Sequence, residues 1–221
     1  MTALADLGPL AQLRAGRLGR RLPQLLVGLW IYGVSLALMV RGNDGVAPWD
    51  VLHLGIAEHT GLSLGAVLVI IAFAVLLLWI PLREKPGIGT VANALLIGPS
   101  TDATLAVVGQ PDNQVARAAL MVAGVLLCAL ATAMYIGAQF GRGPRDGLMT
   151  GLVRRTGLSI RLVRTSLEVT VVVVGLLLGG PLGVGTVVFA LTIGPLTQWM
   201  LPAWTVPLGE PVGPVVLAGE N

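Results

Sequence analysis

The polar residues of this chain that could bind a ligand or an ion are few, and several recur 96 positions apart. Asp50 and Asp146 each stand two residues after a proline, at Pro48 and Pro144. In an apolar chain, such a carboxylate can bind an ion or a substrate. It can instead interact with the positive end of a helix and with loop amides. Both interpretations stay open for this pair.

Further polar candidates surround a Gly-Pro pair in each half of the chain. Because proline lacks an N–H and clashes with the preceding turn, each pair is expected to interrupt its helix and free backbone carbonyls for a ligand. A kink that only serves packing is the alternative, and Asp102 becomes a solvated loop residue if its helix ends at Pro99. The candidates are Gly98, Pro99, Thr101, Asp102, Gly194, Pro195, Thr197 and Gln198.

Three other polar features have simpler interpretations. Asn93 lies in an apolar segment, where it bonds either a neighbouring helix or a substrate. Arg164 and Glu168 are four residues apart, a spacing that predicts an ion pair on a helix surface. His53 and His59 are expected at an outward-facing surface, where two histidines give only weak grounds for a metal site. No metal and no cofactor is predicted.

The elements that carry these residues are duplicated. Residues 21–99 align without a gap to residues 117–195, with about 24 identities in about 79 pairs. One shared motif, G-x-x-P-x-D-x-L-x-x-G-x-x-x-x-T-G-L-S, begins at Gly45 and at Gly141, and Gly-x-Gly-Thr begins at Gly87 and at Gly183. Many membrane transporters are built from two such halves.

The composition is that of a membrane protein. Hydrophobic residues make up 55% of the chain and charged residues 11%, against about a quarter charged in soluble domains. The one cysteine, Cys128, supports neither a disulfide nor a thiolate metal site. Six stretches are long enough to cross a bilayer as helices: Pro23–Val40, Leu64–Ile80, Ile88–Val108, Ala118–Gln139, Ile160–Leu178 and Val184–Leu201. The predicted fold is therefore an all-α membrane protein.

The positive charges predict how the spans are oriented. About 12 of the 14 Lys and Arg residues fall on one side, which makes that side and both termini cytoplasmic. Each repeat has three spans, so the second copy should enter the membrane inverted, as a 3+3 repeat. The predicted divisions are a cytoplasmic segment 1–22, repeat 1 over 23–108, a connection 109–116, repeat 2 over 117–204 and a cytoplasmic tail 205–221.

A short helix is expected in the first loop of each repeat, over Pro48–His59 and Pro144–Arg155. Proline suits a first helical turn. A dozen residues cannot cross the bilayer, so each helix either lies at the interface or is re-entrant. The predicted caps are Gly61 and Gly157 at the C-terminal ends, with Ser63 and Ser159 capping the next spans.

The run R-G-N-D-G-V-A-P-W-D-V-L-H, with T-G-L-S and P-G-I-G-T-V-x-N-A-L-L-I-G-P after it, resembles the YczE-like branch of the YitT/YczE bacterial integral membrane proteins. The resemblance extends from about Arg21 to Pro195. It implies a multi-pass protein of the bacterial inner membrane. It implies no activity and supplies no catalytic residues.

Two functions remain open. The first is a small transporter or permease with a site where the repeats meet, binding an unknown small molecule or ion, with Asp50, Asp102 and Asp146 as candidate ligands. The second is an accessory or regulatory protein with a dry, packed centre, whose partner is another membrane protein; a homo-oligomer is also open. An enzyme is not predicted, because H-E-x-x-H and G-x-S-x-G are absent. Nucleic-acid binding is excluded because topology accounts for the positive charge.

Overall fold

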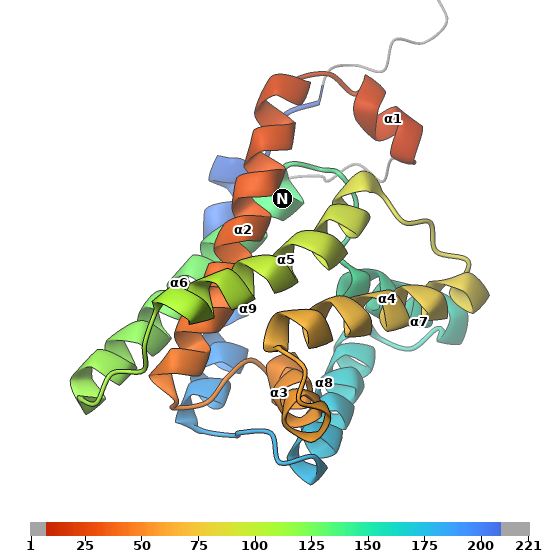
Figure 1. Ribbon diagram of the computed structural model, residues 1–221. Coiled ribbons are helices and arrows are strands. Elements are labelled where there is room, and N and C mark those ends of the chain that lie inside the picture. Colours follow the sequence, from red (N-terminus) through yellow and green to blue (C-terminus); the bar gives the residue numbers. More distant parts are fainter. Residues whose placement is uncertain (1–7, 209–221) are drawn as a thin grey trace, which may run out of the picture.

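The computed structural model describes residues 8–208, which form nine helices and contain no strand. Residues 1–7 of the predicted N-terminal segment and 209–221 of the predicted tail lie outside the described residues. The helices, shown in Figure 1, are α1 (Pro9–Arg14), α2 (Leu18–Gly42), α3 (Pro48–Thr60), α4 (Leu64–Leu82), α5 (Ile88–Val107), α6 (Gln114–Gly137), α7 (Pro144–Thr156), α8 (Ile160–Leu177) and α9 (Val184–Trp204).

The six predicted spans coincide with the six longer helices α2, α4, α5, α6, α8 and α9. Four of these, α2, α4, α6 and α9, are long and apolar enough to cross a membrane. The other two carry more polar or charged side chains, Asn93 and Asp102 in α5 and Arg161, Arg164 and Glu168 in α8. The arrangement of all six as a 3+3 repeat stays a prediction.

The centre of the fold is the pair α2 and α6, with α5 packed on α2 and α9 packed on α6 (Figure 1). Glycines allow the close approach. A Cβ at Gly28 of α2 would lie 2.9 Å from the Cβ of Met134, and one at Gly124 of α6 would lie 2.9 Å from the carbonyl oxygen of Ser35. These small residues therefore serve packing within the chain.

Each short helix packs on a long helix from the other half of the chain. Helix α3 contacts α8, and α7 contacts α4, as the neighbouring ribbons in Figure 1 show. Prolines begin both helices, and Gly61 and Gly157 end them with φ of 69° and 71°, as predicted. Ser63 and Ser159 are confirmed as N-caps of α4 and α8. The first turn of each short helix is mostly buried and its last residues are exposed.

The N-terminal part of the chain differs from the prediction. Helix α2 begins at Leu18, earlier than Pro23. Arg21 is not a loop charge but is fully buried, because its guanidinium donates hydrogen bonds to the carbonyls of Gln12, Ala138 and Gln139 at 2.7–2.9 Å. The buried arginine ties the start of α2 to the end of α6.

The prediction that the two Gly-Pro pairs break their helices is wrong. Helices α5 and α9 continue through Pro99 and Pro195. Both prolines face outward and are exposed. Interior prolines are tolerated in apolar helices, where neighbouring groups and local adjustment satisfy the freed backbone groups. The site is therefore built from side chains and short-helix ends, not from an unwound segment of α5 or α9.

Candidate functional site

The two halves of the fold differ in how tightly their second and third long helices pack. In the first half, α4 packs on α5 through Gly65 and Gly98, and a Cβ on either glycine would overlap the carbonyl oxygen of the other. The equivalent positions in the second half are Arg161 and Gly194. A Cβ at Gly194 would meet nothing within 4 Å, and α8 is not packed on α9 in this way. The crevice between α4 and α5 is therefore closed, and its counterpart between α8 and α9 is open.

A large cavity of about 410 Å³ lies at the open crevice. Its walls come from α8 and α9, from the C-terminal part of α6 and from the first turns of α3 and α7. The sequence candidates that line it are Asn93, Asp146, Gly194, Thr197 and Gln198, joined by the charged residues Arg145, Arg164 and Glu168.

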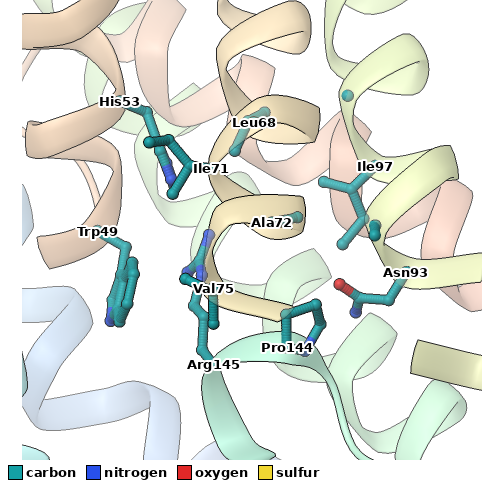
Figure 2. A pocket seen from close by; sticks show the side chains of 12 residues that line it. Trp49, His53, Leu68, Ile71, Ala72, Val75, Asn93, Ile97, Pro144 and Arg145 are labelled. Carbon is teal, nitrogen blue, oxygen red and sulfur yellow. The ribbon is translucent and has the colours of Figure 1, made fainter. Parts of the chain in front are cut away.

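A small cavity of about 30 Å³ lies at the closed crevice, between α4 and α5 (Figure 2). This volume is enough for a water molecule. Its α4 residues Leu68 and Ile71 are the repeat equivalents of Arg164 and Leu167, which line the large cavity. The two cavities share the wall formed by Trp49, Asn93, Ile97, Pro144 and Arg145. The two cavities therefore adjoin at this wall, and sequence-equivalent residues of α4 and α8 line them.

Asp50, His53 and Arg145 meet at this shared centre. The Asp50 side chain is 3% exposed, and its Oδ1 is hydrogen-bonded to Nδ1 of His53 at 2.9 Å. Its Oδ2 has no hydrogen-bond partner among residues 8–208. Nη2 of Arg145 lies 3.8 Å from Oδ1, which makes a loose ion pair. His53 is thus buried, and its predicted place at the surface is wrong.

Arg145 extends from the first turn of α7 between Trp49 and Val75 toward His53 (Figure 2). Its guanidinium carbon lies 5.1 Å from the centre of the Trp49 ring, a cation–π contact. Its side chain is 30% exposed and donates no hydrogen bond to any residue in the described part of the chain. The donors of this arginine are therefore available to a ligand in either cavity.

Asp146 lies beside Arg145 and lines the large cavity. Its Oδ2 accepts a hydrogen bond of 2.8 Å from the hydroxyl of Tyr135. The ring of Tyr135 packs edge-on against Tyr32 with centroids 6.3 Å apart. Helix α7 is anchored by Trp79, whose Nε1 donates to the carbonyl of Pro144 at 3.0 Å. Within residues 8–208, neither Asp50 nor Asp146 accepts a hydrogen bond from a backbone amide, so loop-amide capping is not their role.

Several candidates lie away from the cavities. Asp102 accepts hydrogen bonds from Ser63 Oγ at 2.6 Å and from the amide of Gly65 at 2.8 Å, so it joins α4 to α5. It is neither a loop residue nor a cavity ligand. Thr101 is buried and donates within the fold to the carbonyls of Gly33 and Ile97, which makes it a packing residue. Its equivalent Thr197 lines the large cavity, and its buried hydroxyl has no partner in residues 8–208.

Sequence reasoning missed Arg145 and the aromatic residues around it. In the sequence, Arg145 stands out only as one of the positive charges on the predicted cytoplasmic side. One feature of the sequence could have identified Arg145 as a site residue. It lies inside the repeated motif, directly before Asp146, at the position that Trp49 occupies in the first copy. The ion pair of Arg164 and Glu168 is confirmed at 2.9 Å. Residues 8–208 contain no group of three or more His, Cys, Asp and Glu side chains suited to a metal.

Comparison with known proteins gives relatives without an established activity. The model of a family of unknown function (DUF6198) matches residues 19–202. An uncharacterized protein of Haemophilus influenzae is 41% identical over 177 residues, which cover 80% of this chain and 81% of the relative. The uncharacterized membrane protein YczE of Bacillus subtilis is 31% identical over 79% of this chain and 82% of its own length. No solved structure matches the chain.

Proposed function

This chain belongs to the family of unknown function DUF6198 and is a membrane protein, and we propose that it is a small transporter that works by alternating access. One observation carries the proposal: two repeat-equivalent crevices share a polar wall, and one is closed while the other is open. A transporter needs this relation, because its central site must reach only one side of the membrane at a time.

In the proposed cycle, the two crevices exchange their states. The large cavity is bounded by the C-terminal parts of α6 and α9 and the N-terminal half of α8. By the positive-inside rule, these helix ends lie on the cytoplasmic side of the inner membrane. The described conformation is therefore open to the cytoplasm. Packing of α8 on α9 would close it, and parting of α4 from α5 would open the outer crevice. The halves act as an inverted 3+3 repeat, and α3 and α7 are re-entrant.

The composition of the cavity favours transport over an accessory role. An accessory protein that only binds a partner would have a centre filled by residues such as leucine and valine. The wall here carries Arg145, Asp146 and Asn93, and charged residues at membrane depth mark substrate or ion pathways. We assign binding and not catalysis to these residues.

The test uses one cysteine pair at equivalent positions. Ile71→Cys lies in the closed crevice and Leu167→Cys in the open one. The native Cys128 is fully buried, so the unmodified chain is the silent control. In oriented membrane vesicles, a membrane-impermeant maleimide should label Leu167→Cys quickly from the cytoplasmic side only. Ile71→Cys should react slowly, and only from the opposite side.

A second measurement distinguishes alternation from a fixed pocket. Cross-linking α8 to α9 should hold the inner crevice shut, and the labelling rate of Ile71→Cys should then rise from the outer side. The proposal would be contradicted if both cysteines were labelled from the same side, or if the labelling rate of Ile71→Cys did not change on cross-linking.

A further inference from the structure

We infer that the ligand of the large cavity is a small zwitterion, whose acidic group binds Arg145 and whose ammonium group binds Asp146. This inference rests on the proposed function, because it assigns the class of substrate to the same cavity. It is carried by the unused donors of Arg145, by the carboxylate and aromatic rings beside it, and by the charge balance of the wall.

The acidic group is assigned to Arg145. A guanidinium binds a carboxylate or phosphate through two parallel N–H donors. Arg145 donates to no residue in the described part of the chain. Its ion-pair partner Asp50 is 3.8 Å away and already bonded to His53, and the nearby Asp146 is held by Tyr135. An arginine at membrane depth normally has a partner. The first turns of α3 and α7 also line this cavity at Trp49 and Pro144, and helix N-termini favour an anion.

The ammonium group is assigned to the Asp146 side of the cavity. One oxygen of Asp146 is held by Tyr135, which fixes the carboxylate at the cavity wall. Four of the chain's ten aromatic residues line this cavity, Tyr32, Trp49, Tyr135 and Phe189. Aromatic faces attract organic cations, most strongly where water is excluded. A carboxylate among aromatic rings therefore suits an amine.

The charge balance selects a zwitterion over a simple anion or cation. The charged residues of the described chain that line the cavity are two arginines, Arg145 and Arg164, and two carboxylates, Asp146 and Glu168, so the formal charges of the lining cancel. Asp50 lies behind Arg145 and is not part of the lining. A ligand with a net charge would leave that charge uncompensated at membrane depth, which is costly. A ligand with one charge of each sign satisfies both poles and keeps the cavity neutral.

Two sources share this chemistry. A free amino acid carries a carboxylate and an ammonium group, and a phosphoethanolamine headgroup carries a phosphate and an ammonium group. A cavity of about 410 Å³ lies within the usual range for small-molecule sites and accommodates either. The experiment therefore includes one arm for each.

The binding test uses thermal unfolding of the full chain in detergent, followed by a thiol-reactive dye. Cys128 is fully buried, so the dye reports unfolding through a native residue. A ligand that binds only the folded state raises the midpoint in a saturable way. The probes are alanine, leucine and phenylalanine, each with its decarboxylated amine and its deaminated acid, and the phosphodiester glycerophosphoethanolamine with ethanolamine and dimethyl phosphate.

At least one zwitterion should give a saturable rise, and removing either of its charged groups should weaken binding roughly 10- to 100-fold. Arg145→Gln should abolish the rise, and Arg145→Lys should retain part of it. Asp146→Asn should weaken zwitterions more than the matching acids. Arg154→Gln, an exposed arginine on the same helix, is the matched control and should bind as the parent does.

Three results would overturn the inference. They are the absence of a saturable shift with every zwitterion, equal affinity for a zwitterion and its amine or acid, and unchanged binding by a folded Arg145→Gln variant. Because the cysteine pair tests alternation without a ligand, a negative binding result with normal labelling rejects the substrate class alone. A larger shift with glycerophosphoethanolamine than with any amino acid would confirm the zwitterion and identify a lipid-type headgroup.

Discussion

The glycines Gly98 and Gly194 offer a matched test of the closed and open crevices. They occupy equivalent places in α5 and α9, and each directly precedes a proline. A Cβ at Gly98 would overlap the carbonyl oxygen of Gly65, whereas a Cβ at Gly194 meets nothing within 4 Å. We therefore expect Gly98→Ala to destabilise the fold and Gly194→Ala to be tolerated.

The expected difference in unfolding free energy between Gly98→Ala and Gly194→Ala comes from the one contribution that they do not share, the steric overlap at Gly98. Replacing glycine by alanine inside a helix gains about 0.5–1 kcal/mol in both helices. Only Gly98→Ala adds an overpacking cost of about 1–3 kcal/mol, and the obstacle at Gly65 is a backbone oxygen that no rotamer change can move. The two variants should therefore differ by about 1–3 kcal/mol in the free energy of unfolding.

The assay is thermal unfolding reported by Cys128, with both variants prepared in the same detergent. Gly194→Ala should melt at or above the parent midpoint and Gly98→Ala below it. If α8 closes on α9 as proposed, Gly194→Ala should also slow exchange of the crevices, so it should lower transport while raising stability. Equal midpoints for the two variants, or a more stable Gly98→Ala, would refute the reasoning from steric contact.

Three further predictions concern contacts that hold the crevices and the centre in place. Arg21→Gln should cost at least about 3 kcal/mol in unfolding free energy, because several buried carbonyls lose a charged donor; Arg20→Gln, on the exposed face, should stay within about 0.5 kcal/mol of the parent. Trp79→Phe should cost about 0.5–1.5 kcal/mol, since it removes the buried hydrogen bond between α4 and the carbonyl of Pro144; an unchanged thermal midpoint would contradict this. Asp102→Ala removes two hydrogen bonds between α4 and α5, so Ile71→Cys should be labelled faster in that background. An unchanged labelling rate would show that these bonds do not keep the crevice between α4 and α5 closed.

Much of the fold could be predicted because the relevant signals are local. Hydropathy and length gave the positions of the long helices, and proline, glycine and serine gave the ends of α3, α7, α4 and α8. The duplication predicted which residues are equivalent. The Arg164–Glu168 pair was predictable because a spacing of four fixes neighbours on a helix.

The candidate site was only partly predictable. Asp146 and Thr197 were found because they recur between the repeats, and both line the large cavity. The same signal selected Thr101 and Asp102, which pack or tie α4 to α5 instead. Sequence equivalence cannot separate these cases, because equivalent positions have different neighbours in the two halves, as Gly98 and Gly194 do.

The sequence by itself determined the membrane class, the helices, their caps and the internal equivalence, since each depends on residues close along the chain. Only the tertiary structure decided which crevice is open, that His53 and Arg21 are buried, and that Arg145 reaches the shared wall. These outcomes depend on contacts between helices far apart in the sequence, from Gly65 with Gly98, 33 residues apart, to Asp50 with Arg145, 95 residues apart. Packing between distant segments is a property of the folded chain, and no local pattern encodes it.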